Sequence, residues 1–289
     1  MNAKYRHVWT VSHTEIYQFI KSTNTKITDY SFKSYFDYIV AKYHIKVLEH
    51  HFENDMILGI TMIDKLGISL SYEKETSTSR QNFTKCHEIG HIVLNHQGKV
   101  FKELNKNRQP IELEANYFAS ILLAPDIILL DQILYQNKTF YSIAKDLLMS
   151  PKALAVRLRQ FIEKYSTIPF YQAKRVVYSF KANNENRIEL INIFKAAENQ
   201  IVSHYNNITI DPYKKFDFLY HTKGIVTNIL IKDLQSQTFR KTIQKNYPDV
   251  KFQVTHNIWY AWNTNKLDKD EAYQRAIWIN TSNNIKGAR

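Results

Sequence analysis

The 289-residue sequence predicts an α+β protein in which a small β-sheet accompanies several helices. Two observations carry this prediction. Short runs of β-branched and aliphatic residues lie together between residues 44 and 73, which is typical of strands. Longer segments before and after them repeat apolar residues at helical spacing. Glycine and proline are scarce, with six of each, so the limits of the elements come from pattern rather than from turn residues.

The first half of the chain alternates between these two kinds of segment. Aromatic residues at helical spacing predict two helices within residues 14–43. Three strands are then expected, at residues 44–50, 56–63 and 68–73. Two further helices are expected at residues 77–96 and 110–124, separated by a loop at 98–109. Ser77, Thr78 or Ser79 is the expected N-cap of the first, and Pro110 suits the first turn of the second.

The second half begins with a helix, a short turn and another helix over residues 139–163. Ser150 is the expected N-cap of the second of these helices, and Pro151 is its first residue. Beyond Pro169 we expect strands at 176–180, 224–231 and 250–262 interleaved with helices, as in a separate α/β or α+β domain. The predicted domains are therefore residues 1–137, 138–168 and 169–289.

Charge is distributed unevenly along the chain. The net charge is +12, yet residues 1–137 are neutral and the whole excess lies in residues 138–289. Such a basic region predicts an anionic partner, nucleic acid or another anion, with a solvated surface as the alternative. The single cysteine, Cys86, rules out an internal disulfide and suits the cytoplasm. No apolar run is long enough for a membrane span, so we expect a cytoplasmic protein without membrane association.

The stretch KCHEIGHIVLNH, residues 85–96, contains the most specific motif. On a helix, His87 and His91 lie four residues apart on one face, where two imidazoles can bind one zinc ion. Glu88 lies beside that face, where a carboxylate can act as general base toward water. An HExxH pattern alone also occurs by chance, and a catalytic zinc site needs a third protein ligand.

The helix at 110–124 supplies the candidates for this ligand. A histidine at position 97 would be the alternative, but that position is Gln97. Glu112 and Asn116 share a helical face, so we expect Glu112 as the ligand and Asn116 as the partner that fixes a ligand imidazole. Glu114 points away from Glu112 and stays the fallback ligand. The small residues Gly90 and Ala115 predict that the two helices approach closely.

The two segments NFTKCHEIGHIVLNH and IELEANYFASILLAPDIIL together resemble the ImmA/IrrE family of bacterial metallopeptidases. The matching residues include Phe83, His87, Glu88, His91, Glu112, Glu114, Ala115, Asn116, Phe118, Ala119, Leu122, Leu123 and Pro125. The resemblance covers about residues 40–165. It implies a zincin-like domain with a Zn²⁺ cofactor, and a protein substrate that is a helix-turn-helix transcriptional repressor of a mobile element or of stress-response genes.

Other parts of the chain carry weaker expectations. A helix-turn-helix-like segment commonly follows the protease domain in this family, and residues 138–168 are expected to form it. The first half of its second helix, PKALAV, is mostly apolar, so we expect this segment to pack or to dock substrate rather than to read bases. Some members then carry a GAF-like sensor, and residues 169–289 are expected to regulate or recognise a partner. Cys86 stands where the family usually has a small residue and is expected to pack in the core. His96 is expected only to end its helix, and Trp259, Tyr260, Trp262, Tyr273 and Trp278 to be core residues.

Two other classes of function remain open at this point. One is a non-catalytic zinc-containing DNA-binding regulator, and the other is a toxin or interaction module that retains the peptidase fold. Glu88 favours the enzyme, because a purely structural metal site does not need a general base.

Overall fold

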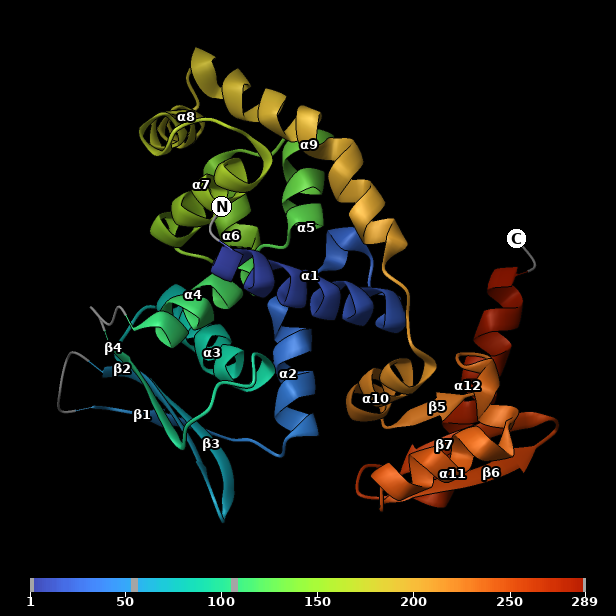
Figure 1. Ribbon diagram of the computed structural model, residues 1–289. Helices are drawn as coiled ribbons and strands as arrows, with labels where there is room; N and C mark the ends of the chain where they lie inside the picture. The colour runs from blue at the N-terminus through green and yellow to red at the C-terminus, as the bar shows by residue number, and fades with distance from the viewer. Residues whose placement is uncertain (1–2, 53–56, 105–108, 288–289) are drawn as a thin grey trace. The chain divides into compact units, whose positions relative to one another are not determined.

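The computed structural model describes residues 3–52, 57–104 and 109–287, which fold into two compact units (Figure 1). The first unit comprises residues 1–20 and 25–208, and the second comprises residues 21–24 and 209–289. Each unit combines helices with a small sheet, so the predicted α+β class is confirmed. The functional division of the chain at residues 137 and 168 stays a prediction.

The first unit contains a four-stranded sheet. Its order is β1-β3-β2-β4, where β1 is Lys46–His50, β2 is Ile57–Asp64, β3 is Gly67–Glu73 and β4 is Val100–Leu104. β1 runs parallel to β3, and the other neighbours are antiparallel. The three expected strands are confirmed, although Met56, at the start of the second, lies outside the described residues.

The fourth strand corrects the expectation of a loop over residues 98–109. Lys- and Asn-rich composition concealed β4, but its residues follow the period of two that defines a strand. Phe101 and Glu103 are buried while Lys102 between them is exposed. Residues 105–108 of the expected loop lie outside the described part of the chain.

One face of the β2–β4 pair supports helix α3 (Thr78–Val93). Gly59 stands opposite Glu103, and Thr61 stands opposite Phe101. Paired residues point to the same face of a sheet, so these four positions share one side. A Cβ atom at Gly59 would lie 2.6 Å from Glu88 Oε1 of α3, and glycine therefore permits this close contact between strand and helix.

Further helices precede and follow the sheet in the first unit. The N-terminal segment forms α1 (Ala3–Thr23), the short η1 (Ile27–Asp29) and α2 (Phe32–Lys42), which confirms the two helices expected there. The chain then continues after the sheet with α4 (Pro110–Leu123), α5 (Asp126–Leu130) and the π-helical turn η2 (Asp131–Tyr135).

The expected helix, turn and helix over residues 139–163 are also present. They are α6 (Phe140–Asp146) and α7 (Pro151–Tyr165), joined through Leu148, whose φ of 55° lies in the left-handed region. The Ser150 hydroxyl accepts a hydrogen bond from Ala153 N at 3.1 Å, so Ser150 caps α7 as predicted.

The prediction of a strand at residues 176–180 is wrong, because this stretch lies inside helix α8 (Phe170–Ala182). Val176 and Val177 favour strands by their branching, but they join Ala173 and Phe180 in a buried series at helical spacing, and this packing decides the conformation. Helices η3 (Glu185–Arg187) and α9 (Ile188–Asn207) follow. α8 and α9 lie at the end of the first unit opposite its sheet (Figure 1).

The second unit has a three-stranded antiparallel sheet of order β5-β7-β6. Its elements are α10 (Pro212–Lys223), β5 (Ile225–Thr227), η4 (Lys232–Gln235), α11 (Gln237–Asn246), β6 (Val250–Thr255), β7 (Ile258–Asn263) and α12 (Lys269–Gly287). The expected strand at 224–231 is confirmed only in its first part. The expected strand at 250–262 is a hairpin, because His256 and Asn257 both have positive φ and form a tight two-residue turn.

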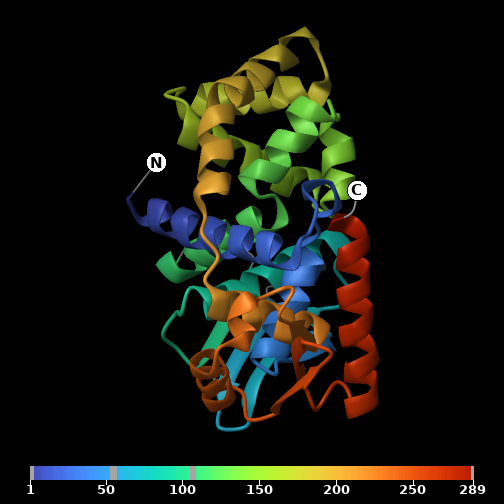
Figure 2. The same cartoon turned by 90° about the vertical axis from the view of Figure 1, so that its right-hand side faces the viewer.

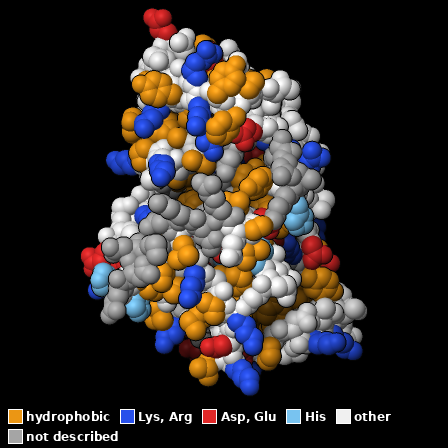
Figure 3. All heavy atoms as spheres, turned by 60° about the vertical axis from the view of Figure 1, so that its left-hand side comes forward, with side chains coloured by type: hydrophobic (Ala, Val, Ile, Leu, Met, Phe, Trp, Pro, Cys, Tyr) orange, Lys and Arg blue, Asp and Glu red, His pale blue; other side chains and the backbone are white. Residues whose placement is uncertain are grey.

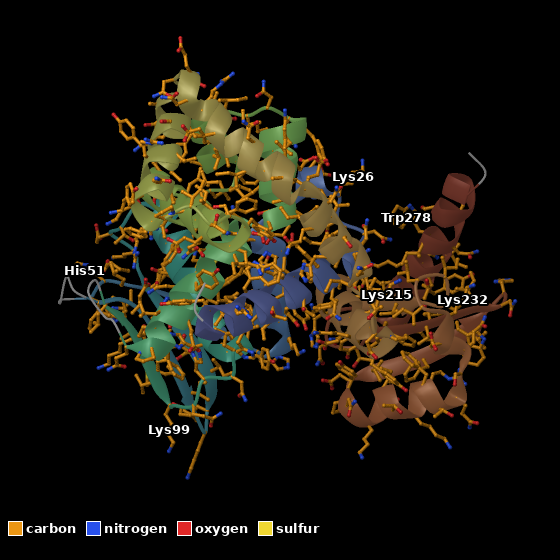
Figure 4. All side chains as sticks on the ribbon, turned by 45° about the horizontal axis from the view of Figure 1, so that its top comes forward. Lys26, His51, Lys99, Lys215, Lys232 and Trp278 are labelled. Atoms are coloured by element: carbon orange, nitrogen blue, oxygen red, sulfur yellow. The ribbon has the colours of Figure 1, made fainter. Side chains whose placement is uncertain are left out.

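Both faces of this second sheet are covered. Ala261 of β7 joins a core with residues of α10 and α11, while its neighbours Tyr260 and Trp262 join another core with residues of α12. α12 packs against β5 and β7 (Figure 2). The expectation of a core position is confirmed for Tyr260 and Trp262, but wrong for Trp278, which is 70% exposed (Figure 4).

Among the described residues, no single helix is both long and apolar enough to cross a membrane. A bent pair, Pro110–Leu123 with Asp126–Tyr135, passes that test when its two parts are taken together.

Candidate metal centre

Helices α3 and α4 bring the predicted site residues together. His87, Glu88 and His91 lie on buried positions of α3, and Glu112 lies in the first turn of α4. The predicted close approach at Gly90 is confirmed, because a Cβ atom there would lie 3.0 Å from Phe118 Cδ1 and 3.5 Å from the Cα of Ala115.

The side chains of His87, His91 and Glu112 form one buried cluster. His87 Nε2 lies 3.1 Å from Glu112 Oε2 and 3.1 Å from His91 Nε2. His91 Nε2 lies 3.6 Å from Glu112 Oε1. Two ligands of a tetrahedral zinc ion, each about 2.0–2.1 Å from the metal, are themselves about 3.3 Å apart. The three side chains therefore fit a metal ion, with one ligand atom from each within 4.8 Å of the others.

A hydrogen bond outside the cluster orients His87. The Asn116 side-chain oxygen lies 3.1 Å from His87 Nδ1. An amide oxygen only accepts, so Nδ1 carries a proton and Nε2 is the nitrogen that faces the cluster. Asn116 is thus placed where the sequence predicted it, one helical turn from Glu112 and against a candidate ligand imidazole.

His96 and Glu114 orient His91 in the same way, and neither contact was expected from the sequence. His96 Nε2 lies 3.1 Å from Glu114 Oε2, and His96 Nδ1 lies 2.9 Å from His91 Nδ1. Glu114 accepts a hydrogen bond from His96 Nε2, so a neutral His96 accepts one at Nδ1 from His91 Nδ1. This leaves His91 Nε2 free to face Glu112, and Glu114 lies with His96 rather than in the triad.

The turn after α3 explains how His96 reaches His91. Asn95 has a φ of 54°, and the amides of Asn95 and His96 donate to the carbonyls of Ile92 and His91. This is the Schellman pattern, in which the chain folds back over the last helical turn. The expectation that His96 merely ends its helix is therefore wrong, and the left-handed preference of Asn95 is the sequence signal for the turn.

Glu88 lies beside the triad and is fully buried. The Thr61 hydroxyl of β2 donates to Glu88 Oε2 at 2.6 Å. Glu88 Oε1 has no hydrogen-bond partner among the described residues. One carboxylate oxygen is therefore fixed by the sheet, and the other is available to a ligand.

A further buried carboxylate, Glu103 of β4, also acts on the site. It pairs with Arg80 of α3, and its Oε2 has no partner in the described part of the chain. Burial lowers the pKa of His87, but the negative charges of Glu103, Glu112 and Glu88 outweigh burial and raise it to about 9. Burial likewise raises the pKa of Glu88 to about 8. The metal-free cluster thus retains protons that a cation would displace.

Phe101 packs against the cluster, while Cys86 and His51 lie outside it. The His91 ring stacks on Phe101 of β4, with centroids 4.3 Å apart. Cys86 is buried, and burial raises the pKa of its thiol, which agrees with the expected packing role. His51 follows the end of β1 at the surface (Figure 4), where its ring lies 3.4 Å from Glu73.

The comparisons with known proteins agree with this geometry. Residues 40–159 match the model of the Peptidase_M78 family, described as an IrrE N-terminal-like domain. No curated protein and no solved structure gives a significant match to the chain. The matched range includes the sheet, α3, α4 and every residue of the triad. Residues 40–159 are therefore a domain of the Peptidase_M78 family, the ImmA/IrrE metallopeptidases that the two sequence motifs resemble.

Proposed function

We propose that the protein is a zinc-dependent endopeptidase that cleaves a partner helix-turn-helix repressor and so relieves repression of a mobile element or of stress-response genes. The observation that carries the peptidase assignment is the buried group of His87, His91 and Glu112 with Glu88 beside it. Structural zinc sites use four protein ligands, whereas catalytic sites use three and keep one position open. Three ligands with an adjacent carboxylate fit the catalytic kind.

His87, His91 and Glu112 would hold the ion. When bound, zinc would supply Lewis-acid polarisation of the scissile carbonyl and would lower the pKa of water. Asn116 holds a proton on His87 Nδ1, so Nε2 is the nitrogen that would bind the ion, and the pair of His96 and Glu114 does the same for His91 Nε2. The protein thus fixes which nitrogen of each imidazole faces the ion, and binding displaces the further proton that the metal-free cluster holds at His87.

Glu88 is the proposed general base and acid. Thr61 holds Oε2, so Oε1 is the atom that takes a proton from the attacking water and returns it to the leaving nitrogen. Burial raises the pKa of Glu88 to about 8 in the metal-free protein, and a divalent cation nearby would lower it. Glu88 would then be ionised at neutral pH, yet remain basic enough to carry a proton between two steps.

Residues 169–289 are proposed to regulate the enzyme or to recognise its partner. Most of this range belongs to the second unit, which forms its own compact core, and all the candidate metal ligands lie in the first unit. The basic residues of 138–289 are proposed to bind the partner, nucleic acid or another anion. A non-catalytic DNA-binding regulator, or a toxin or interaction module with the same fold, is the alternative that the experiment must separate.

The experiment incubates the full chain, loaded with Zn²⁺, with a proteome-derived peptide library and detects new peptide ends by mass spectrometry. We expect cleavage that a chelator abolishes. Glu88→Gln should keep stoichiometric metal but lower the rate by about 10²–10⁴-fold, the usual contribution of a general acid–base group. His87→Ala should instead lose the metal. No cleavage by the loaded wild type, or a normal rate for Glu88→Gln, would refute the peptidase.

The repressor substrate needs its own test. Candidate helix-turn-helix repressors, beginning with any that is encoded beside this protein, are purified and incubated with the wild type under the conditions that cleave library peptides. We expect cleavage at one or a few bonds and loss of operator binding. If the repressor stays intact while library peptides are cut, the enzyme class stands and the proposed substrate is wrong.

A further inference from the structure

Two pockets lie along helix α7 in the first unit. Their volumes are about 600 and 650 Å³, and both are lined by Ser150, Lys152 and Val156. The first pocket is bounded by residues of α3, α4 and α7, and the second by residues of α7 and α8. We call these two pockets together the α7 groove.

The α7 groove begins beside the metal centre. Its first pocket is lined by Asn116, whose side-chain oxygen contacts His87, and by Arg80, which pairs with Glu103. Phe83, one helical turn before His87 on α3, lines the same pocket. A chain lying in the groove therefore passes next to the residues proposed to hold the metal.

The walls of the α7 groove are apolar and its rim is basic. Ala153, Val156 and Val177 contribute apolar side chains. Lys152, Lys174 and Lys181 line the second pocket, and none of them pairs with a carboxylate among the described residues. Figure 3 shows Lys and Arg side chains interleaved with hydrophobic ones at the upper end of the first unit, where α8 and α9 lie.

The charge of the two flanking helices is strongly one-sided. Residues 151–182, which span α7 and α8, contain seven Lys or Arg and a single acid, Glu163. Glu163 already contacts Arg159 at 3.4 Å, and Arg157 is buried against Asp126. Arg175 of α8 pairs with Glu189 at 3.8 Å. The rim lysines Lys152, Lys174 and Lys181 are thus left for a ligand of opposite charge.

We propose that the α7 groove binds an acidic segment of the protein substrate, one that places apolar side chains in the pockets and Asp or Glu side chains against the rim lysines. This inference rests on the proposed peptidase function and specifies the kind of substrate segment that the enzyme binds. A peptide is favoured over nucleic acid because the first half of α7 lines a hollow between neighbouring helices. A recognition helix must instead project to enter a major groove about 12 Å wide.

The test measures peptide binding by fluorescence anisotropy with full-length Glu88→Gln, so that no cleavage interferes. The probe is a fluorescein-labelled 12-residue peptide that alternates Asp or Glu with Leu or Phe. A peptide with Lys at the acidic positions and a 20-base-pair DNA duplex are the comparison ligands. The groove variant adds Lys152→Glu, Lys174→Glu and Lys181→Glu, and the matched control adds Lys46→Glu, Lys65→Glu and Lys74→Glu on exposed positions of the sheet region.

We expect the acidic peptide to bind and the groove variant to weaken it by at least about tenfold, while the sheet variant stays within about twofold. Circular dichroism and metal content confirm that each variant is folded. Equal weakening in both variants, or no binding of the acidic peptide, would overturn the proposal. Preferential binding of the duplex that the groove variant abolishes would show a nucleic-acid surface instead. Because binding is read without catalysis, failure of the groove and failure of the peptidase give different results.

Discussion

Two polar clusters are buried in the first unit, one around Asp126 and the other around His87. Asp126 begins α5 and lies between α1 and α7. Its Oδ2 accepts hydrogen bonds from Trp9 Nε1 at 3.0 Å and from the Tyr165 hydroxyl at 2.8 Å. Its Oδ1 accepts from Arg157, whose Nε donates to the Ala124 carbonyl at 2.9 Å. In this cluster the buried charges are paired, and their polar atoms are bonded.

The metal centre also buries charged groups but leaves some of their polar atoms without a partner among the described residues. The Nε2 atoms of His87 and His91 face each other at 3.1 Å. Glu88 Oε1 and Glu103 Oε2 have no hydrogen-bond partner in the described ranges. Unsatisfied buried groups are rare in native proteins because each one lowers stability. The contrast indicates that the Asp126 cluster is structural, and we call it the closed cluster because its charges are paired with one another. The His87 cluster instead keeps polar atoms for a cation and a substrate.

The largest effect on stability is expected at the closed cluster. Asp126→Ala leaves Arg157 buried without its carboxylate, which should lower the free energy of unfolding of the first unit by about 3–5 kcal/mol. Denaturant unfolding measures this loss. Asp146→Ala is the matched control, because it removes a partly exposed ion pair with Lys138 and should cost less than about 1 kcal/mol.

If the two clusters are separate in function, metal binding should survive the Asp126→Ala substitution. Folded Asp126→Ala should bind Zn²⁺ with the wild-type stoichiometry. An unfolding free energy close to that of the wild type, or loss of metal from the folded protein, would show that the two clusters are not separate in function.

The next effect is expected at His96. Without its imidazole, His91 loses the acceptor that fixes its tautomer, so His96→Ala should weaken zinc binding by about 10–100-fold. Competition with a chelating dye measures the dissociation constant. His51→Ala is the control, since that ring is largely exposed and contacts Glu73 instead. Equal affinities for the two variants would mean that His96 does not position His91.

The triad could be predicted because its geometry is local. The spacing of His87 and His91 fixes their common face on any helix, and Asn116 shares the helical face of Glu112. The family match over residues 40–159 then agrees with that reading. Helical spacing alone distinguished Glu112 from Glu114, and the structure places Glu112 with the two histidines.

The remaining site residues depend on long-range pairing that spacing does not reveal. Thr61 and Glu103 reach α3 only because β2 and β4 pair in one particular register. The strand expected at 176–180 failed for a related reason, because two adjacent valines favour a strand locally while their packing partners in the fold select a helix. Local propensity is a weak guide wherever tertiary contacts outweigh it.

A smaller effect is expected at Thr61. Its substitution distinguishes the role of the general base from the role of the metal ligands. Thr61→Val keeps the shape of the side chain but removes the hydroxyl that donates to Glu88 Oε2. We expect kcat on a library peptide to fall by about tenfold, since hydrogen bonds to charged groups contribute about 1.5–3 kcal/mol and part of this is lost. Zinc affinity should stay unchanged, and Thr61→Ser should restore the rate. Loss of zinc affinity in Thr61→Val would assign Thr61 to metal binding instead.

The last and most gradual effect is the acid sensitivity of the closed cluster. Burial raises the pKa of Asp126, but His13 and Arg157 outweigh burial and hold it well below its usual range. The unfolded chain has an ordinary carboxyl pKa of about 3.9, so it takes up a proton first as the pH falls. The stability that Asp126 contributes is therefore fully present above about pH 4 and is lost as the pH falls toward the folded pKa, by at most about 1.4 kcal/mol per pH unit.

The measurement is the difference in unfolding free energy between wild type and Asp126→Asn from pH 6 to pH 3, which cancels the titration of the other carboxylates. That difference should be constant down to about pH 4 and then shrink; a difference that stayed constant to pH 3 would mean that Asp126 is not held as an ion by its buried partners.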